Sequence, residues 1–426
     1  VTIVSHGDQF ELAGPLCALN FGLIENCTIT GTVYPIPFSA GDSSMSGLVG
    51  RNEGVIRDSS TTVTIFASGG AGGLSAVNSS NGEVINCHAD GDIVEADGMQ
   101  GDRLGGLVAL NGGIIRDSFA TGDVSGHDEI GGLIGHMEMG EVENCWASGT
   151  VTGDTDVGGL IGALADDFAD RTATVRDSYS ISAVSGSMNV GGLIGSLGRS
   201  SNTTTITGCH ASGSVFGGPN VGGLVGLATN TTISESFADG TLLTGVSVGG
   251  LVGMFNSGEI SRCYTNVAFA YVEGFFATLG GLVGTNHGTI SDSVALGAAS
   301  ATDGAPGPVG GLVGLNETAG TVVRCYSVGE VTGGADRGGL IGTNNGSVSD
   351  SFYDTDTSGM SDDTGKGEPK TTVQMTNIAT FTDTTTEGLD APWDFLGNPN
   401  NDSGNQDYWN IGGAINDGYP YLRYFQ

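Results

Sequence analysis

Seven cysteines are the side chains of this sequence best suited to chemistry, and six of them occupy one position of a repeated segment. That position lies three residues after an Ile or Val, and repeats with Cys alternate there with repeats with Ser. In chain order the column reads Cys27, Ser59, Cys87, Ser118, Cys145, Ser178, Cys209, Ser236, Cys263, Ser293, Cys325 and Ser351. No Cys-x-x-Cys pair occurs, and on a strand the Cys-His neighbours at 87–88 and 209–210 would point in opposite directions. The spacing therefore disfavours zinc binding and thiol catalysis and favours packing.

The same column gives a distance prediction. If one repeat forms one coil of stacked strands, successive cysteines lie two layers apart, about 9.6 Å. A disulfide tolerates Cα atoms no farther apart than about 7 Å, so the column would consist of free thiols. If two repeats formed one large coil instead, the cysteines would lie on adjacent layers and could pair.

An acidic segment, "DTDTSGMSDD" at 354–363, offers oxygen ligands at positions 1, 3, 5 and 9 of an EF-hand-like loop. The ligands would be Asp354, Asp356, Ser358 and Asp362. Position 12 is Gly365, where a bidentate Glu belongs, so the match is half complete. We predict calcium as the one cofactor with any support in the sequence, with an acidic exit turn as the alternative.

Two further motifs resemble catalytic or phosphate-binding sequences but lack the flanking structure or residues that these functions require. "GVSVG" at 245–249 fits a nucleophile elbow, but it lies in a turn between short strands where a strand-to-helix elbow is required. "TGKGEPK" at 364–370 lacks both the distant Gly and the Ser/Thr of a phosphate loop. We predict no catalytic residues and therefore no enzyme activity.

An aromatic segment, "VAFAYVEGFFATL" at 267–279, departs from the short polar segments at the equivalent place in other repeats. Its large side chains are Phe269, Tyr271, Phe275 and Phe276. They must either pack against the body of the protein or be covered by a partner, which makes them our candidate partner contact. Candidate glycosylation sites are the Asn-x-Ser/Thr positions Asn202, Asn230, Asn316 and Asn345.

The charge balance limits the partners. The formal net charge is −34, from 47 acidic and 13 basic residues, and this disfavours nucleic acid, whose phosphates need clustered basic side chains. An acidic surface poor in lysine suits high salt or calcium-rich surroundings, and we favour high salt. No apolar run reaches the roughly 18 residues of a membrane-spanning helix, so no transmembrane segment is predicted.

The elements that position these residues are short and repeated. A Gly-Leu element ending in GGLVG or GGLIG recurs with its Leu at 16, 48, 74, 107, 133, 160, 193, 224, 251, 282, 312 and 340. Glycine divides the chain into pieces too short for helices, and such units bury an apolar face only by stacking. We predict an all-β fold, a β-solenoid (β-helix) of about twelve coils with three short strands per coil and a small C-terminal cap.

A column of rings follows the Cys/Ser column by one residue. It comprises His88, Phe119, Trp146, Tyr179, His210, Phe237, Tyr264, Val294, Tyr326 and Phe352, with Val294 the one aliphatic member. Adjacent residues of a strand face opposite ways, so these rings should point outward if the Cys/Ser column points inward. Stacking within the sheet is favoured over a binding strip.

The Gly-Leu elements resemble the GLUG repeat, found in large secreted and cell-surface proteins including bacterial adhesins. The resemblance covers about residues 14–353 and implies adhesion or scaffolding without defined catalytic residues. We expect an N-terminal edge or cap at 1–13, a solenoid at 14–353 and a C-terminal cap at 354–426.

The expected function is a non-catalytic extracellular structural or adhesive protein: an adhesin stalk, a surface fibre or filament subunit, or an envelope component. A secreted carbohydrate-active enzyme and a virion fibre or spike protein are the alternatives. Expected partners are copies of itself, other surface proteins and glycans, at the cell surface, outside the cell or on a virion.

Overall fold

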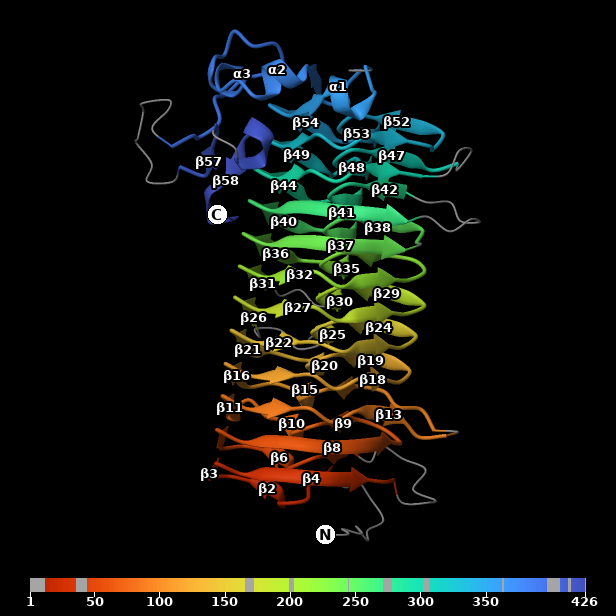
Figure 1. Cartoon of the computed structure of the whole chain (residues 1–426), viewed down its shortest axis with the longest axis vertical. Coiled ribbons are helices and arrows are strands. Elements are labelled where there is room, and N and C mark those ends of the chain that lie inside the picture. Colours follow the sequence, from red (N-terminus) through yellow and green to blue (C-terminus); the bar gives the residue numbers. More distant parts are fainter. Residues whose placement is uncertain are drawn as a thin grey trace.

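The chain winds into a parallel β-solenoid that stands as a rod, with its first coil at one end and its C-terminal segment at the other (Figure 1). The computed structural model describes residues 12–35, 44–97, 99–164, 172–198, 203–243, 245–270, 278–301, 306–361, 364–396, 407–412 and 415–425. Three sides of the rod are parallel sheets of twelve strands each. The predicted fold class is confirmed.

Sheet A contains β1 (Leu12–Ala13), β5 (Ser44–Ser46), β9 (Ala71–Gly72), β14 (Leu104–Gly105), β19 (Asp128–Gly131), β24 (Thr155–Gly158), β29 (Met188–Gly191), β34 (Val221–Gly222), β38 (Ser247–Gly249), β42 (Thr278–Gly280), β47 (Pro308–Gly310) and β52 (Asp336–Gly338). Sheet B contains β2 (Cys17–Asn20), β6 (Val49–Asn52), β10 (Ser75–Asn78), β15 (Val108–Asn111), β20 (Ile134–Met137), β25 (Ile161–Leu164), β30 (Ile194–Leu197), β35 (Val225–Ala228), β39 (Val252–Phe255), β43 (Val283–Asn286), β48 (Val313–Asn316) and β53 (Ile341–Asn344).

Sheet C contains β3 (Leu23–Glu25), β7 (Val55–Arg57), β11 (Glu83–Ile85), β16 (Ile114–Arg116), β21 (Gly140–Glu143), β26 (Ala173–Arg176), β31 (Thr204–Thr207), β36 (Thr231–Ser234), β40 (Gly258–Ser261), β44 (Thr289–Ser291), β49 (Thr321–Val323) and β54 (Ser347–Ser349). The fourth side contains β4 (Thr28–Val33), β8 (Ser60–Ala67), β12 (His88–Ala89), β13 (Ile93–Glu95), β17 (Phe119–Ala120), β18 (Val124–Ser125), β22 (Trp146–Ala147), β23 (Thr150–Thr152), β27 (Tyr179–Ser180), β28 (Ala183–Ser185), β32 (His210–Ala211), β33 (Ser214–Phe216), β37 (Phe237–Leu243), β41 (Tyr264–Ala270), β45 (Val294–Ala295), β46 (Ala299–Ser300), β50 (Tyr326–Ser327), β51 (Val331–Thr332), β55 (Phe352–Asp354) and β56 (Glu368–Lys370).

The number of strands per coil differs from the expectation of three. A single coil such as β14 to β18 has five short strands, because the fourth side divides into two pieces, and elsewhere these pieces merge into one strand such as β37. The corner between sheet C and the fourth side separates segments that look continuous in sequence. At this corner the residue before each Cys or Ser adopts a left-handed conformation, as Asp117 does with φ 51°. Asn, Asp and Gly tolerate that conformation and hold nine of the twelve corner positions: Asn26, Asp58, Asn86, Asp117, Asn144, Asp177, Gly208, Asp292 and Asp350. The other three are Glu235, Arg262 and Arg324.

The Gly-Leu element is explained by close stacking at the corner between sheets A and B. A Cβ on Gly106 would lie 2.1 Å from the carbonyl oxygen of Gly132 in the next coil, so only glycine fits. The Leu that follows points into the core, and from Leu48 to Leu340 this column is fully buried. Two apolar cores run along the rod, one under the Leu column and one under the second piece of the fourth side.

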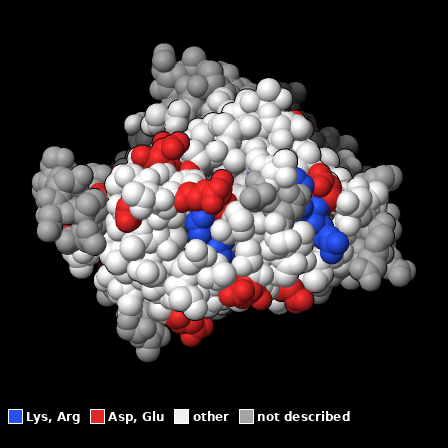
Figure 2. All heavy atoms as spheres, turned by 90° about the horizontal axis from the view of Figure 1, so that it is seen from above, with Lys and Arg blue, Asp and Glu red and all other residues white. Residues whose placement is uncertain are grey.

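The C-terminal segment closes the rod. It contains α1 (Thr355–Ser358), α2 (Thr372–Met375), α3 (Ala379–Thr382), the antiparallel pair β57 (Trp409–Asn410) and β58 (Tyr421–Leu422), and the 3-10 turns η1 (Ile415–Gly418) and η2 (Arg423–Phe425). Seen from above, this end shows more carboxylates than basic groups (Figure 2). Within the described ranges, no helix has the length and apolar character needed to cross a membrane.

Candidate functional site

The Cys/Ser column lies inside the rod and is a hydrogen-bonded ladder. Register pairs His88 with Phe119 and Phe119 with Trp146, so one repeat makes one coil and the cysteines lie on alternate coils. All seven cysteines are free thiols, as the one-coil arrangement predicts. The backbone N–H of Cys145 donates to the Oγ of Ser178 in the next coil at 3.0 Å, and the other five cysteines of the column repeat this contact. The alternation is therefore structural: each Ser hydroxyl accepts the backbone N–H of the Cys in the coil before it.

The interior thiols are poorly reactive at neutral pH. Burial raises the pKa of Cys87 to about 11 and of Cys145, Cys209 and Cys263 to about 12. The thiolate is the reactive form of cysteine, so these side chains have little nucleophilic character at neutral pH.

The aromatic column forms an outward ladder along the fourth side. Seven rings from His88 to Tyr264 stack with centroids 4.4–6.0 Å apart and planes within 10° of parallel. Each ring is half-buried, while the residue after it, such as Ala120 or Ala147, is buried. Because neighbouring rings cover each other's faces, the ladder presents ring edges to solvent. A sugar or a base stacks on a free face, so this geometry supports the structural role predicted for the column.

The C-terminal segment covers the end of this ladder. Val294, Tyr326 and Phe352 are buried there with Trp393 and Trp409 in a separate apolar cluster. The hydroxyl of Tyr326 donates to the carbonyl oxygen of Pro420 and accepts from Asn416 at 2.9 Å. The indole N–H of Trp393 donates to the Asp350 carbonyl at 3.0 Å, and that of Trp409 donates to Asp292 at 3.4 Å. The cap is therefore a hydrogen-bonded core of its own.

The proposed calcium ligands occupy different positions from those of an EF-hand. Asp354 is buried at the N-terminus of α1, where one oxygen accepts from the N–H of Asp356 and of Thr357 at 2.8 and 3.3 Å. Its other oxygen accepts from the hydroxyls of Thr372 at 2.8 Å and Tyr419 at 2.7 Å. These donors give Asp354 a capping role.

The remaining proposed ligands have protein partners or fall outside the structure. Asp356 accepts from the N–H of Thr372 at 3.0 Å, and the hydroxyl of Ser358 accepts from the N–H of Met360. Asp362 lies outside the described residues. The calcium site stays a prediction, in a segment whose described oxygens bond to the protein itself.

The aromatic partner segment is described only at its start. Phe269 is half-buried against the second apolar core, in strand β41. Tyr271, Phe275 and Phe276 lie outside the described residues. Of the two roles expected, packing against the rod therefore holds for Phe269.

One candidate glycosylation site is corrected. Asn316 is fully buried, and its amide nitrogen donates to Asn344 at 2.8 Å and to two backbone carbonyls. A glycan cannot attach to a nitrogen held inside the rod. Among the other sites Asn345 is exposed, Asn230 is half-buried and Asn202 lies outside the described residues.

Two ionic clusters on the outside of the rod were not predicted from the sequence. His127 lies between coils, with its Nδ1 3.3 Å from Asp102 and from Asp128 and its Nε2 3.5 Å from Asp154. Burial lowers the pKa of His127, but the three carboxylates raise it overall. The atoms of His127, Asp102 and Asp128 lie within 4.8 Å of one another, as metal ligands would. All four side chains are partly exposed, so the cluster serves equally as a solvated ion-pair network.

A second cluster contains Glu129, His136 and Arg103. His136 lies 3.2 Å and Arg103 2.9 Å from the Glu129 carboxylate. Burial opposes ionisation of Glu129, yet these two partners hold its pKa at about 2. Both clusters join residues from different coils, so only the register of the coils could have predicted them.

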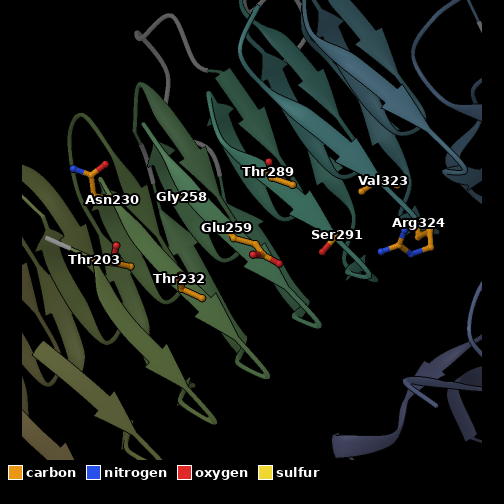
Figure 3. A pocket seen from close by; sticks show the side chains of 9 residues that line it. All are labelled: Thr203, Asn230, Thr232, Gly258, Glu259, Thr289, Ser291, Val323 and Arg324. Carbon is orange, nitrogen blue, oxygen red and sulfur yellow. The ribbon is translucent and has the colours of Figure 1, made fainter. Parts of the chain in front are cut away.

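A groove crosses the outer face of sheet C (Figure 3). Its volume is about 580 Å³. Its lining residues are Thr203, Asn230, Thr232, Gly258, Glu259, Thr289, Ser291, Val323 and Arg324. Arg324 binds Asp292 through two nitrogens at 2.8 and 2.7 Å, so its charge is already paired, whereas Glu259 is exposed at the middle of the groove. The groove thus offers hydroxyls and one carboxylate.

Comparison with known proteins agrees with the fold. The stacked coils, with the buried Gly-Leu corner, define a parallel β-solenoid built from a short repeat. The family model of the GLUG motif matches residues 217–242, from the turn before β34 into β37. The chain is therefore a β-solenoid in which residues 217–242 match the GLUG motif.

A bacterial relative adds a second match. A protein of Evansella cellulosilytica named "Putative Gly-rich membrane protein" is 44% identical over 96 residues. The matched part spans 21% of this chain and 10% of that protein. No solved structure matches the chain.

Proposed function

We propose that this chain is a non-catalytic, rod-like structural or adhesive element of a cell-surface or secreted protein. The observation that carries the proposal is the continuity of three parallel sheets through twelve strands each. With about 4.8 Å between strands, such a stack spans roughly 50–60 Å. A body of this shape separates what lies at its two ends.

The ladders inside and outside the rod support the same role. Backbone donors received by Ser, buried Asn pairs such as Asn52 with Asn78 at 2.9 Å, and the stacked rings all tie each coil to the next. These contacts run parallel to the rod axis, so they resist separation of the coils. The acidic surface keeps such a rod solvated, and high salt is the setting that we propose for it.

The groove on sheet C supports an adhesive contact with a glycan. Its hydroxyls come from several successive coils, and a chain of sugar hydroxyls can exchange hydrogen bonds with them. Binding should be weak, because the groove lining contains no aromatic ring for a sugar to stack on.

Electron microscopy of native cells labelled with an antibody against this chain tests the surface role. Label at the cell surface, on fibres or on an envelope lattice is the expected result. Soluble, isolated molecules that hydrolyse glycans would contradict the proposal. A glycan array with the wild-type chain and a Glu259→Gln variant tests the adhesive part separately. An unchanged array pattern would exclude the groove as the contact.

A further inference from the structure

The first coil of the rod leaves open a column that every later coil buries. Leu16 is 48% exposed, whereas its equivalents from Leu48 onward are fully buried. Two further apolar side chains of the first coil, Phe21 and Leu23, are 75% and 55% exposed. Phe21 occupies the position that Glu53 occupies in the second coil. An apolar end of this kind is uncommon on a chain with so many carboxylates.

The backbone at this end has donors without described partners. In the second coil the N–H groups of Glu53, Val55 and Ser60 donate to carbonyls of the first coil, each at 2.8 Å. The equivalent donors of the first coil belong to Phe21, Leu23 and Thr28. Among the described residues, β2, β3 and β4 pair only with the second coil, so these donors face outward along the axis.

Side-chain ladders reach the same end unfinished. Asn20 donates through its Nδ2 to Asn52 at 2.8 Å, and Asn52 in turn donates to Asn78. In this ladder each Oδ1 accepts from the Asn of the coil before it, and Asn20 is the first member described. The backbone N–H of Cys27 likewise donates to the Oγ of Ser59 in the second coil. Because Cys and Ser alternate along the column, a coil stacked before the first one would carry a Ser next to Cys27.

The opposite end of the rod cannot fill this gap. Its outermost groups already bond to the C-terminal segment: Ile341 donates to the Lys366 carbonyl at 3.3 Å and Asn344 to the Gly365 carbonyl at 2.6 Å. A second copy joined head to tail would first have to displace this segment. A second copy joined head to head would bring strands together antiparallel, out of the register that the ladders follow.

We propose that the N-terminal end of the rod is a joining face that receives one more coil of the same repeat in parallel register. The occupant is a GLUG-type coil with its C-terminal side open, distinct from the twelve coils of this chain. The added coil stacks a Leu on Leu16, an Asn on Asn20 and a Ser on Cys27. Its backbone carbonyls accept from the N–H groups of Phe21, Leu23 and Thr28. The rod is thus polar: its N-terminal end is open to a further coil, and its C-terminal end is covered by the cap. This proposal does not depend on where the protein is located.

An inserted coil tests the joining face. Residues 103–128 span one full repeat, with Leu107, Asn111 and Ser118 at the required positions, and a copy placed directly before Leu12 is spaced to continue the register. The control carries the same insertion with Leu107→Asp and Ile115→Asp within the copy. Hydrogen exchange is measured at the amides of Phe21, Leu23 and Thr28, with an interior strand such as β25 as the reference for an intact rod.

The exchange rates of these amides distinguish the possible outcomes. With the inserted coil these three amides should exchange at least about tenfold more slowly than in the parent chain, and the control should show no slowing. Unchanged exchange above an intact rod would overturn the proposal, whether or not the inserted segment folds. If the parent chain is a dimer that Leu16→Asp dissociates, the face binds a second copy and the proposed occupant is wrong.

Discussion

The two ends of the rod are built from the same repeat and differ in what covers them. At the C-terminal end Leu340 and Ile341 are fully buried, and Ser351 accepts the N–H of Glu368 at 3.0 Å. At the N-terminal end Leu16 is half exposed and Cys27 is incompletely buried. An open solenoid end exposes both apolar side chains and unpaired strand edges. The comparison teaches that a coil gains its stability from neighbours on both sides.

The most sensitive way to sharpen this comparison is thiol labelling of the native protein. Cys17 and Cys27 in the first coil are partly exposed, whereas the five later cysteines are buried. With the pKa of Cys263 at about 12, its thiolate fraction near neutral pH is about a thousandfold lower than that of an ordinary thiol. Titration with a thiol reagent should therefore show two fast and five very slow cysteines.

Denaturation provides the control for that titration. All seven thiols should react when the unreduced protein is unfolded. Fewer than seven would reveal a disulfide and contradict the one-repeat coil. Seven fast thiols in the native protein would mean that the interior opens as readily as the first coil.

The second prediction removes the covering of the C-terminal end. Trp393 is fully buried, with ring centroids 4.7 Å from Phe381 and 4.9 Å from Trp409. Trp393→Ala should destabilise the cap by about 3–5 kcal/mol, through lost burial and the cavity left behind. Chemical denaturation followed by fluorescence reports this, because Trp409 remains in the cap. Exposed Tyr424→Ala is the matched control and should shift the midpoint little. A similar loss from both variants would contradict a separate cap core.

The third prediction compares the same substitution at two heights of the rod. Leu224→Ala, in a fully buried position, should cost about 2–5 kcal/mol of unfolding free energy. Leu16→Ala, in the half-exposed equivalent position, should cost about 1 kcal/mol or less, because part of its surface already contacts water. Urea denaturation of the two variants measures both. Equal losses would show that the first coil is covered in solution.

The sequence predicted most of the construction because the repeat carries its own packing rules. The inward Cys/Ser column and the outward rings each follow from a residue type recurring in register, and the structure confirms both. The Gly-Leu element marked each repeat, and the structure adds that it forms a tightly stacked corner. The corner between sheet C and the fourth side was missed, because a left-handed residue such as Asp117 breaks a strand without interrupting its apolar pattern.

The candidate sites were harder to predict, because they depend on contacts between coils. The sequence showed Asn316 as an ordinary sequon, but its burial follows from an Asn in the next coil. The cluster around His127 takes one carboxylate from the coil before and one from the coil after. Such neighbours lie about one repeat apart along the chain, as Asn316 and Asn344 do at 28 residues and Asn78 and Asn111 at 33. Spacing within one repeat cannot reveal them.

The last prediction concerns the junction between rod and cap. Asp354 accepts two backbone and two hydroxyl donors, and it contributes with burial to raising the pKa of Tyr419 to about 12. Asp354→Asn keeps the size of the side chain but removes its charge and turns one acceptor into a donor. We expect a loss of about 1–3 kcal/mol in cap stability, measured by the fluorescence-detected denaturation used for Trp393.

Added calcium separates the capping role of Asp354 from the predicted metal site. If Asp354 acts through its hydrogen bonds alone, calcium leaves the unfolding midpoint of the wild-type cap unchanged. A midpoint that rises with calcium in the wild type and stays fixed in Asp354→Asn would establish a metal site at this turn. The exposed Asp383→Asn serves as the control for a general effect of carboxylate loss, because it caps only the turn at Thr385 and lies away from Asp354's donors. The end of the rod would then be closed by an ion as well as by aromatic packing, and its difference from the open end would depend on calcium concentration.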